Sequence, residues 1–401
     1  MRTMPARDKT AAKATPGSSA LRDSFDAAFD AAEQEFRGSG DADRLFDLRM
    51  LRVKLRNGIP GDRPATLADV PHEKRVTVED VYREAAEEAG RILLANGDIP
   101  AAWSYFQAIR KPEPIREAIE QTPIVEGFDD RQQELTQIAL YEMAHPRRGV
   151  EMLLAGSGIC NTVTSLDQVL PQLSVTDRKA CAAVIVGELH SQLLASVRAD
   201  AAKRTGDAAD RLPATLDELL QTHPDLLENG VYHADVSHLA AVVRFARSLD
   251  RESDALRLAI DLCRYGKRLD RPLIFEGEPP FEDLYVSHEH FLAAIADPDS
   301  ADDPLDYFRK KLAAEPDARD RPLLAYVLTD LLMRTGRGDE AVEVARVELA
   351  PLGEQTGFSF AELCREAGRL DTLADYAREQ GDRVLELAAQ FGSVAAAGAN
   401  D

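Results

Sequence analysis

The chain has few of the features that mark secreted, membrane-spanning or disulfide-stabilised proteins. Its four cysteines (Cys160, Cys181, Cys263 and Cys364) are spread over 401 residues without a C-x-x-C pair, so we expect reduced, mostly buried thiols. No run approaches the roughly 18 consecutive apolar residues that cross a bilayer. No apolar stretch follows the basic N-terminal residues, as it does in a signal peptide. These absences predict a cytoplasmic protein that has no membrane partner.

Basic residues are fewer than acidic ones. The chain carries 48 Lys and Arg against 70 Asp and Glu, a net charge of -22. Nucleic acids are polyanions, so this balance predicts no nucleic-acid partner. The acidic residues are dispersed rather than gathered in a tail, which is typical of solvated helix faces. The basic residues near the N-terminus are interspersed with Thr, Ala, Pro and Gly. We expect residues 1–20 to form a disordered basic tail.

Helix-forming residues dominate the rest of the chain. Apolar residues at helical spacing predict a helical pair within 21–58, the second helix running from Asp41 to Arg56. Three prolines then predict a linker over 59–76. Thr77 and Asp80 have the spacing of a capping box, which predicts that the next helix begins at Thr77. Hydrophobic residues make up 44% of the chain, enough for a sizeable core.

One segment departs from this helical pattern. Residues 271–286 read RPLIFEGEPPFEDLYV, in which three prolines and a glycine exclude a regular helix. The segment also holds Phe275, Phe281 and Tyr285. Two interpretations remain open: an ordered loop that lines a groove, or a crossover whose aromatic side chains pack inward.

Internal repetition carries the most information about the fold. GRGDEAVEVAR begins at Gly336 and GRLDTLADYAR at Gly368, an offset of 32 residues. Segments beginning at Leu249 and Asn96 have a similar pattern: a tight turn, an acidic residue and then a helix rich in small residues. A unit of two helices cannot bury its apolar face alone, so we expect neighbouring units to stack. A non-repeating helical domain is the alternative, because helical hairpins use the same turn residues.

Residues 324–349, LAYVLTDLLMRTGRGDEAVEVARVEL, resemble the tetratricopeptide repeat, with Gly-Asp-Glu-Ala matching its G-x-x-E-E-A turn. DYFRKKLAAEP, from Asp306, resembles its closing helix and proline. The family's first-helix Trp and Leu-Gly are missing. The resemblance implies an all-α fold, a right-handed superhelix (α-solenoid) of antiparallel helix pairs. Residues 77–234 would be its irregular helical-repeat region and residues 235–401 its TPR-like region. It also implies a concave face that binds a protein or peptide partner.

Seven of the eight histidines lie between residues 145 and 290. Glu142 and His145 have the i,i+3 spacing that places a carboxylate and an imidazole on one helix face. His233 precedes a predicted helix and His238 lies in its first turn. Ser287 is the expected cap of a similar arrangement around His288 and His290. These contexts predict a divalent metal, such as Zn or Fe, held by His145, His190, His233 and His238. Capping, core or surface roles are the alternative.

A second candidate site combines two arginines with a glycine-rich turn. The turn would expose backbone N–H groups at the start of a helix and bind an anion, and its residues are Arg147, Arg148, Gly156 and Gly158. Cys160 follows the turn, where a helix N-terminus lowers a thiol pKa. His145 or His190 could serve it as a base. A helix end, a solvated face and a core cysteine are the alternatives.

Taken together, these patterns predict a non-catalytic helical-repeat scaffold that binds a protein or peptide. They predict no cofactor, a divalent metal being the alternative. The second hypothesis is a metal- or anion-dependent enzyme whose site is built from the central histidines. The third is a structural or oligomerisation module, in which the partner is a second copy of the chain.

Overall fold

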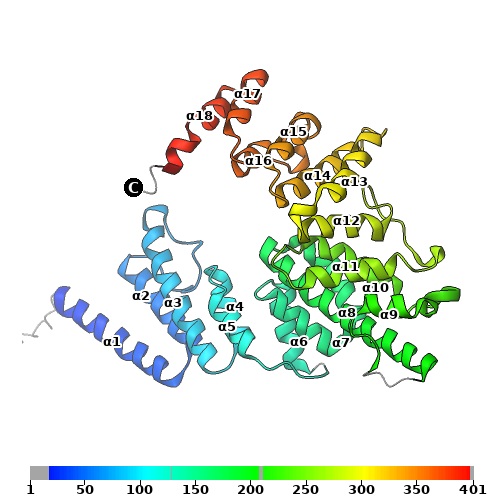
Figure 1. The fold of residues 1–401 in the computed structure, drawn as a ribbon. Helices are drawn as coiled ribbons and strands as arrows, with labels where there is room; N and C mark the ends of the chain where they lie inside the picture. The colour runs from blue at the N-terminus through cyan, green and yellow to red at the C-terminus, as the bar shows by residue number, and fades with distance from the viewer. Residues whose placement is uncertain (1–17, 128, 207–210, 398–401) are drawn as a thin grey trace, which may run out of the picture. The chain divides into compact units, whose positions relative to one another are not determined.

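A computed structural model describes residues 18–127, 129–206 and 211–397 of the chain (Figure 1). These residues contain no β-strand, only one isolated antiparallel bridge between Glu276 and Asp283. The prediction of an all-α protein is therefore confirmed. Of the expected tail over residues 1–20, residues 1–17 lie outside the described part of the chain. α1 begins at Ser18.

The chain forms two compact units, residues 1–149 and 150–401. The elements of unit 1 are α1 (Ser18–Ser39), α2 (Ala42–Arg56), η1 (His72–Lys74), α3 (Arg75–Ala95), α4 (Ile99–Ala108), α5 (Glu113–Gln121), α6 (Asp130–Thr136) and η2 (Gln137–Tyr141). α2, α3 and α4 pack on one another in order. α7 (Pro146–Val169) begins at the end of this unit.

Side-chain caps fix the helix starts of unit 1 where the sequence predicts them. Asp41 accepts a hydrogen bond from the backbone N–H of Arg44 (3.2 Å) at the start of α2. Asp98 does the same for Ala101 (3.0 Å) at the start of α4. The predicted start at Thr77 is wrong. The 3₁₀ turn η1 runs directly into α3, so the chain is already helical when it reaches Thr77.

The Pro-rich segment predicted as a linker lies within unit 1. Ile59 and Val70 are buried, and Lys54, which is fully buried in α2, reaches into the segment. Its ammonium group donates to the Arg63 carbonyl oxygen (2.6 Å) and to Asp69 (2.8 Å). The segment therefore packs on α2 and supplies the oxygen atoms that a buried ammonium group requires.

The described residues of unit 2 form most of α7 and eleven further α-helices. They are α8 (Val175–Thr205), α9 (Leu216–Thr222), α10 (Val236–Phe245), α11 (Ala255–Gly266), α12 (Leu284–Ala296), α13 (Asp302–Ala314), α14 (Arg321–Arg334), α15 (Gly338–Glu348), α16 (Phe360–Glu366), α17 (Leu370–Gln380) and α18 (Arg383–Ala397). From α11 to α18 each helix packs on the next one (Figure 1). This order is what a chain of short helices adopts when each buries its apolar stripe against a sequence neighbour.

α8 is long and apolar enough to cross a membrane by length and composition alone, the single such helix in the part of the chain that the structure describes. Buried core helices pass the same test. In unit 2, α8 packs against α9, α10 and α11. Cys181, Ile185, Leu189 and Leu193 are buried along its length.

The 32-residue repetition in the sequence corresponds to a repetition of local structure. Gly336 and Gly368 both adopt positive φ angles (75° and 71°), which glycine reaches without a steric cost. The next residues match as well, with φ/ψ of −102°/49° at Arg337 and −109°/50° at Arg369. Arg369 pairs with Asp339 at 2.8 Å. The shared turn therefore starts α15 and α17 in the same way.

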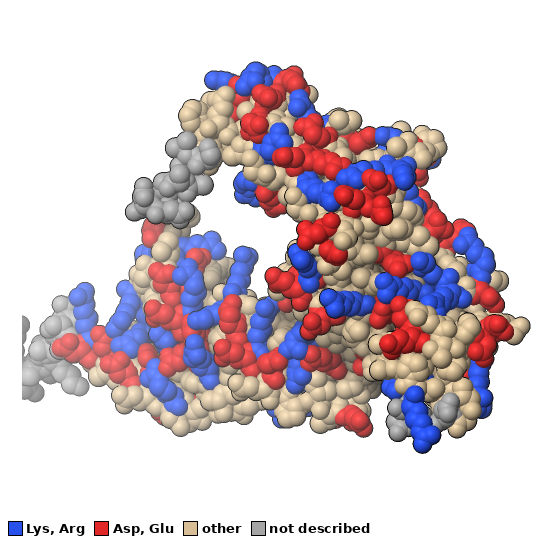
Figure 2. Space-filling view, in the orientation of Figure 1, with Lys and Arg blue, Asp and Glu red and all other residues tan. Residues whose placement is uncertain are grey.

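Basic and acidic side chains alternate over the face shown in Figure 2. Many of them form ion pairs between neighbouring helices. One example is Arg309, whose guanidinium binds both carboxylate oxygens of Glu340 at 2.6 Å. The excess of acidic residues is thus spread over partly compensated helix faces, as the sequence predicts.

Candidate functional site: a pocket of unit 2

The candidate site lies between α10, α12 and the segment over residues 271–283. Asp235 caps α10 by accepting hydrogen bonds from the backbone N–H groups of Ser237 (2.8 Å) and His238 (3.2 Å). The helix continues into the 3₁₀ turn η6 (Ala246–Ser248). Arg244 and Arg247 stand three residues apart at this end, a spacing that places both side chains on one face.

The 271–283 segment is an ordered loop. Its two sides meet at the Glu276–Asp283 bridge, where the N–H of Gly277 donates to the carbonyl oxygen of Glu282 (3.2 Å). A Cβ atom on Gly277 would lie 2.0 Å from the carbonyl oxygen of Phe281. This position therefore requires glycine, because the two sides of the loop approach too closely for a side chain.

Both interpretations of the aromatic side chains in this segment hold, each for different residues. Phe281 and Tyr285 are buried, and the Phe281 ring lies 4.3 Å from that of His288 and 5.9 Å from that of Phe308. Phe275 is 49% exposed and lines the pocket. The buried rings hold the loop against α12 and α13, and Phe275 is left at the mouth of the pocket.

The pocket has a volume of about 480 Å³. Apolar and charged side chains share its lining. The lining includes Ala240, Arg244, Arg247, Phe275, Glu276, Glu278, Phe281, Leu284 and His288. A pocket of this size holds a small molecule or a few residues of a peptide.

Arg247 contributes a cation to the lining of this pocket. Its guanidinium carbon lies 4.8 Å from the centre of the Phe281 ring, a cation–π arrangement. No carboxylate of the described residues lies within 4.0 Å of its guanidinium group, whereas Arg244 pairs with Asp167 at 3.1 Å. Solvent reaches the Arg247 side chain, but the protein atoms around it, and then the charge of Arg244, lower its pKa. Burial and the neighbouring positive charge both penalise the charged guanidinium group, and a bound anion would offset that penalty.

His288 contributes a buried acceptor to the same wall. The residue is 1% exposed, and its Nδ1 lies 2.6 Å from the Leu284 carbonyl oxygen, so we assign the ring proton to Nδ1. Burial lowers the pKa of His288 to about 3, and the ring is neutral. Its Nε2 atom has no hydrogen-bond partner among the residues that the structure describes. The wall therefore holds an acceptor that lacks a donor.

The sequence predicts part of this site, namely the 271–286 segment with Phe275 and Phe281. Its prediction of Ser287 as a helix cap is wrong. The structure starts α12 at Leu284 after Asp283, and Ser287 is buried inside the helix. Arg244 and Arg247 were missed. Nothing in their local sequence distinguishes them from arginines on a solvated helix face.

The four histidines of the predicted metal site have separate neighbours. His145 Nε2 lies 2.9 Å from Glu120 in unit 1. In unit 2, His190 faces Asp261 at 3.7 Å and His233 bonds Asp200 at 3.1 Å. His238 lies 3.2 Å from the sulfur atom of Cys160. Among the described residues, no group of three or more His, Cys, Asp or Glu side chains could hold a metal ion.

Glu142 and His145 do not share a helix face as predicted. The helix ends at Tyr141, and Met143 adopts a positive φ of 61°. Glu142 instead accepts a hydrogen bond from the Trp103 indole N–H at 2.6 Å. Burial is the main cause that lowers the pKa of His145, against the opposing charge of Glu120.

The residues of the predicted anion site are distributed over both units. In unit 1, Arg147 pairs with Glu120 at 2.6 Å and Arg148 donates to the Thr122 carbonyl oxygen at 2.7 Å. In unit 2, Gly156 is helical within α7, and Gly158 (φ 72°, ψ 179°) breaks that helix. The two arginines thus have partners within unit 1, and the predicted interruption near the glycines is present at Gly158.

Cys160 follows that interruption and is the exposed cysteine of the four. We expect iodoacetamide at neutral pH to alkylate Cys160 at least about tenfold faster than the others, because burial protects Cys181 and raises the pKa values of Cys263 and Cys364. Mass spectrometry of peptides over time gives the four rates. His238→Ala would slow the reaction if the imidazole assists the thiol. Equal rates at all four cysteines would contradict the exposure of Cys160.

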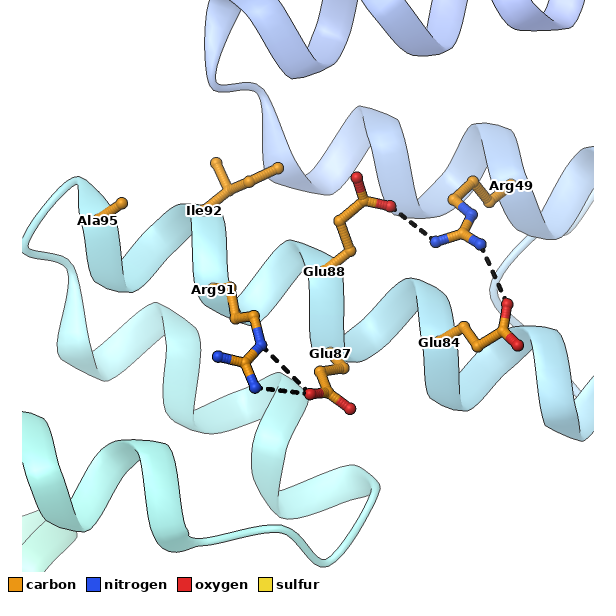
Figure 3. A pocket seen from close by; sticks show the side chains of 7 residues that line it. All are labelled: Arg49, Glu84, Glu87, Glu88, Arg91, Ile92 and Ala95. Atoms are coloured by element: carbon orange, nitrogen blue, oxygen red, sulfur yellow. Dashed lines mark hydrogen bonds and ion pairs between the residues drawn. The ribbon is translucent and has the colours of Figure 1, made fainter.

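A second pocket, of about 540 Å³, lies on unit 1 between α2 and α3 (Figure 3). Its charged side chains bind one another. Arg49 lies 2.7 Å from Glu88 and 3.3 Å from Glu84, and Arg91 lies 2.8 Å from Glu87. Because these charges are internally compensated, a ligand would have to displace existing ion pairs. The pocket of unit 2, with its unpaired arginine, is the stronger candidate.

Comparison of the chain with protein-family models, with curated proteins and with solved structures found no match.

Proposed function

We propose that this protein is a non-catalytic helical-repeat scaffold that binds a segment of a protein partner in the pocket of unit 2. The observation that carries the proposal is the pocket itself. Its ordered loop presents a half-exposed aromatic side chain, Phe275, beside Arg247, a cation that has no carboxylate partner in the described part of the chain. Aromatic and arginine side chains are the ones that most often dominate the energy of protein interfaces.

The proposal extends to the architecture. We infer that unit 2 is a right-handed superhelix of antiparallel helix pairs, similar to tetratricopeptide repeats. Two observations support this inference: consecutive packing from α11 to α18, and identical turns that start α15 and α17. Ala341 and Ala345 are fully buried in α15, and small side chains on one helix face allow close approach of a neighbouring helix.

The test uses the full-length chain and a display library of random dodecapeptides. Enriched peptides are synthesised with a fluorophore, and their Kd values are measured by fluorescence polarisation. We expect Phe275→Ser to weaken binding about five- to twentyfold through the lost apolar contact. Leu323→Ser is the matched control, since Leu323 is similarly exposed (52%) but lies in α14 outside the pocket. Failure to enrich any peptide, or peptides indifferent to Phe275→Ser, would refute the proposed binding site.

A further inference from the structure

Resting on the proposed function, we infer the chemistry of the ligand: the pocket of unit 2 selects a peptide carboxylate, which binds the guanidinium group of Arg247. The same peptide would place an N–H or O–H donor, directly or through a water molecule, toward the Nε2 atom of His288. Both side chains contact one ring, that of Phe281 (4.8 Å and 4.3 Å). Both side chains also line the same pocket, which is why we assign them to one ligand.

The guanidinium group of Arg247 lacks a carboxylate partner among the described residues. Arginines on these helices commonly have carboxylate partners, as the Arg244–Asp167 and Arg334–Asp330 pairs illustrate. Within the described residues, the one hydrogen bond that the Arg247 side chain donates is long, from its Nε–H to the Arg244 carbonyl oxygen (3.4 Å). Its terminal N–H groups remain available for an anion, and a guanidinium group matches the planar geometry of a carboxylate.

His288 supplies a buried acceptor that has no donor among the described residues, an observation independent of Arg247. His288 is almost completely buried, and its Nδ1–H bond to the Leu284 carbonyl oxygen leaves Nε2 as a lone-pair acceptor. Buried acceptors without a donor are rare in folded proteins and often mark the position of a missing water molecule or ligand group. A neutral imidazole beside a cation selects a ligand that carries both an anion and a donor, as a peptide does.

The charges around the pocket favour a single negative charge. Glu276 and Glu278 line the same pocket, and Glu278 is close enough to Arg247 to act on its charge. These carboxylates would repel a dianion such as a phosphoryl group more strongly than a monoanion. Phe275, Ala240 and Leu284 supply apolar surface beside the charges. The ligand we infer is therefore an aspartate or glutamate next to an apolar residue.

The test is a double-substitution cycle on the peptides enriched above. Each peptide is made with its acidic residue and with the matching amide, and Kd is measured for the wild-type chain and for Arg247→Gln. We expect the amide to weaken binding about tenfold or more in the wild type and at most about twofold in Arg247→Gln. Arg257→Gln is the control, because Arg257 is an exposed arginine of α11 outside the pocket. Arg247→Lys, which keeps the charge without the planar group, should give an intermediate Kd.

The remaining variants distinguish the sources of the anion. Each peptide is made as a C-terminal amide and as a free acid, so that a gain confined to the free acid assigns the carboxylate to a chain end. Phosphoserine in place of the acidic residue should bind more weakly, and tighter binding would overturn the preference for a monoanion. Peptides that depend on Phe275 but show no coupling to Arg247 would overturn the carboxylate inference and leave the proposed function standing.

Discussion

Phe106→Ala is expected to lower the free energy of unfolding of unit 1 by about 3–5 kcal/mol. Phe106 is fully buried in α4, and its ring lies directly over Gly90 of α3. A Cβ atom on Gly90 would be 2.6 Å from the nearest ring carbon. Removal of the ring would open a cavity between α3 and α4. The measurement is urea unfolding followed by the fluorescence of Trp103, the single tryptophan of the chain, which is buried in the same helix.

The matched control enlarges the other residue of this contact, Gly90. Gly90→Ala should also destabilise unit 1, by about 1–2 kcal/mol, since overpacking against the ring outweighs the better helix propensity of alanine. In the Gly90→Ala background, Phe106→Ala should cost less than in the wild type, because the added methyl group fills part of the cavity. Additive effects of the two substitutions would show that the two residues do not share a contact.

Acid is expected to destabilise unit 2 through His288. The pKa of this side chain is 6.5 when exposed and falls to about 3 on burial, so the unfolded chain binds a proton that the folded chain excludes. Stability from this source is therefore constant above pH 6.5 and is lost progressively as pH falls from 6.5 toward 3. Between pH 6.5 and 5 the loss amounts to about 2 kcal/mol.

His288→Leu removes this titration and replaces the imidazole with an apolar side chain of similar size. We expect the loss of stability from pH 7 to pH 5 to be smaller in His288→Leu than in the wild type by about that amount. Urea unfolding followed by circular dichroism measures both, with Trp103 fluorescence marking the transition of unit 1. Burial also lowers the pKa values of His145 and His290, so the comparison is between the two proteins. Equal losses of stability in the two proteins would show that His288 binds its proton as readily in the folded chain as in the unfolded chain.

The helical class and many helix boundaries follow from local chemistry that is written in consecutive residues. Asp41 and Asp98 cap helices because their side chains reach N–H groups three residues along the chain. Gly336 and Gly368 end helices because glycine accepts a positive φ. The start of α3 was misjudged for a local reason too: a 3₁₀ turn preceded the capping box and made it redundant.

Pairings between distant residues could not be predicted in this way. The sequence placed His145, His190, His233 and His238 in one hypothetical site, but spacing along the chain does not determine which helices become neighbours. The structure instead pairs His238 with Cys160, a separation of 78 residues, and His233 with Asp200. The absence of the predicted histidine cluster among the described residues has this physical origin.

The amino-acid sequence by itself determined that the chain is helical, that residues 271–286 interrupt the helices and that the turns at Gly336 and Gly368 repeat. These are properties of backbone preference and hydrogen bonding within a few residues. The tertiary structure alone decided which charges remained unpaired. Arg244 and Arg247 have almost the same local sequence environment, yet Asp167 reaches only the first of them. The identity of the candidate site depends on that difference, because an ion pair requires two side chains to meet in space.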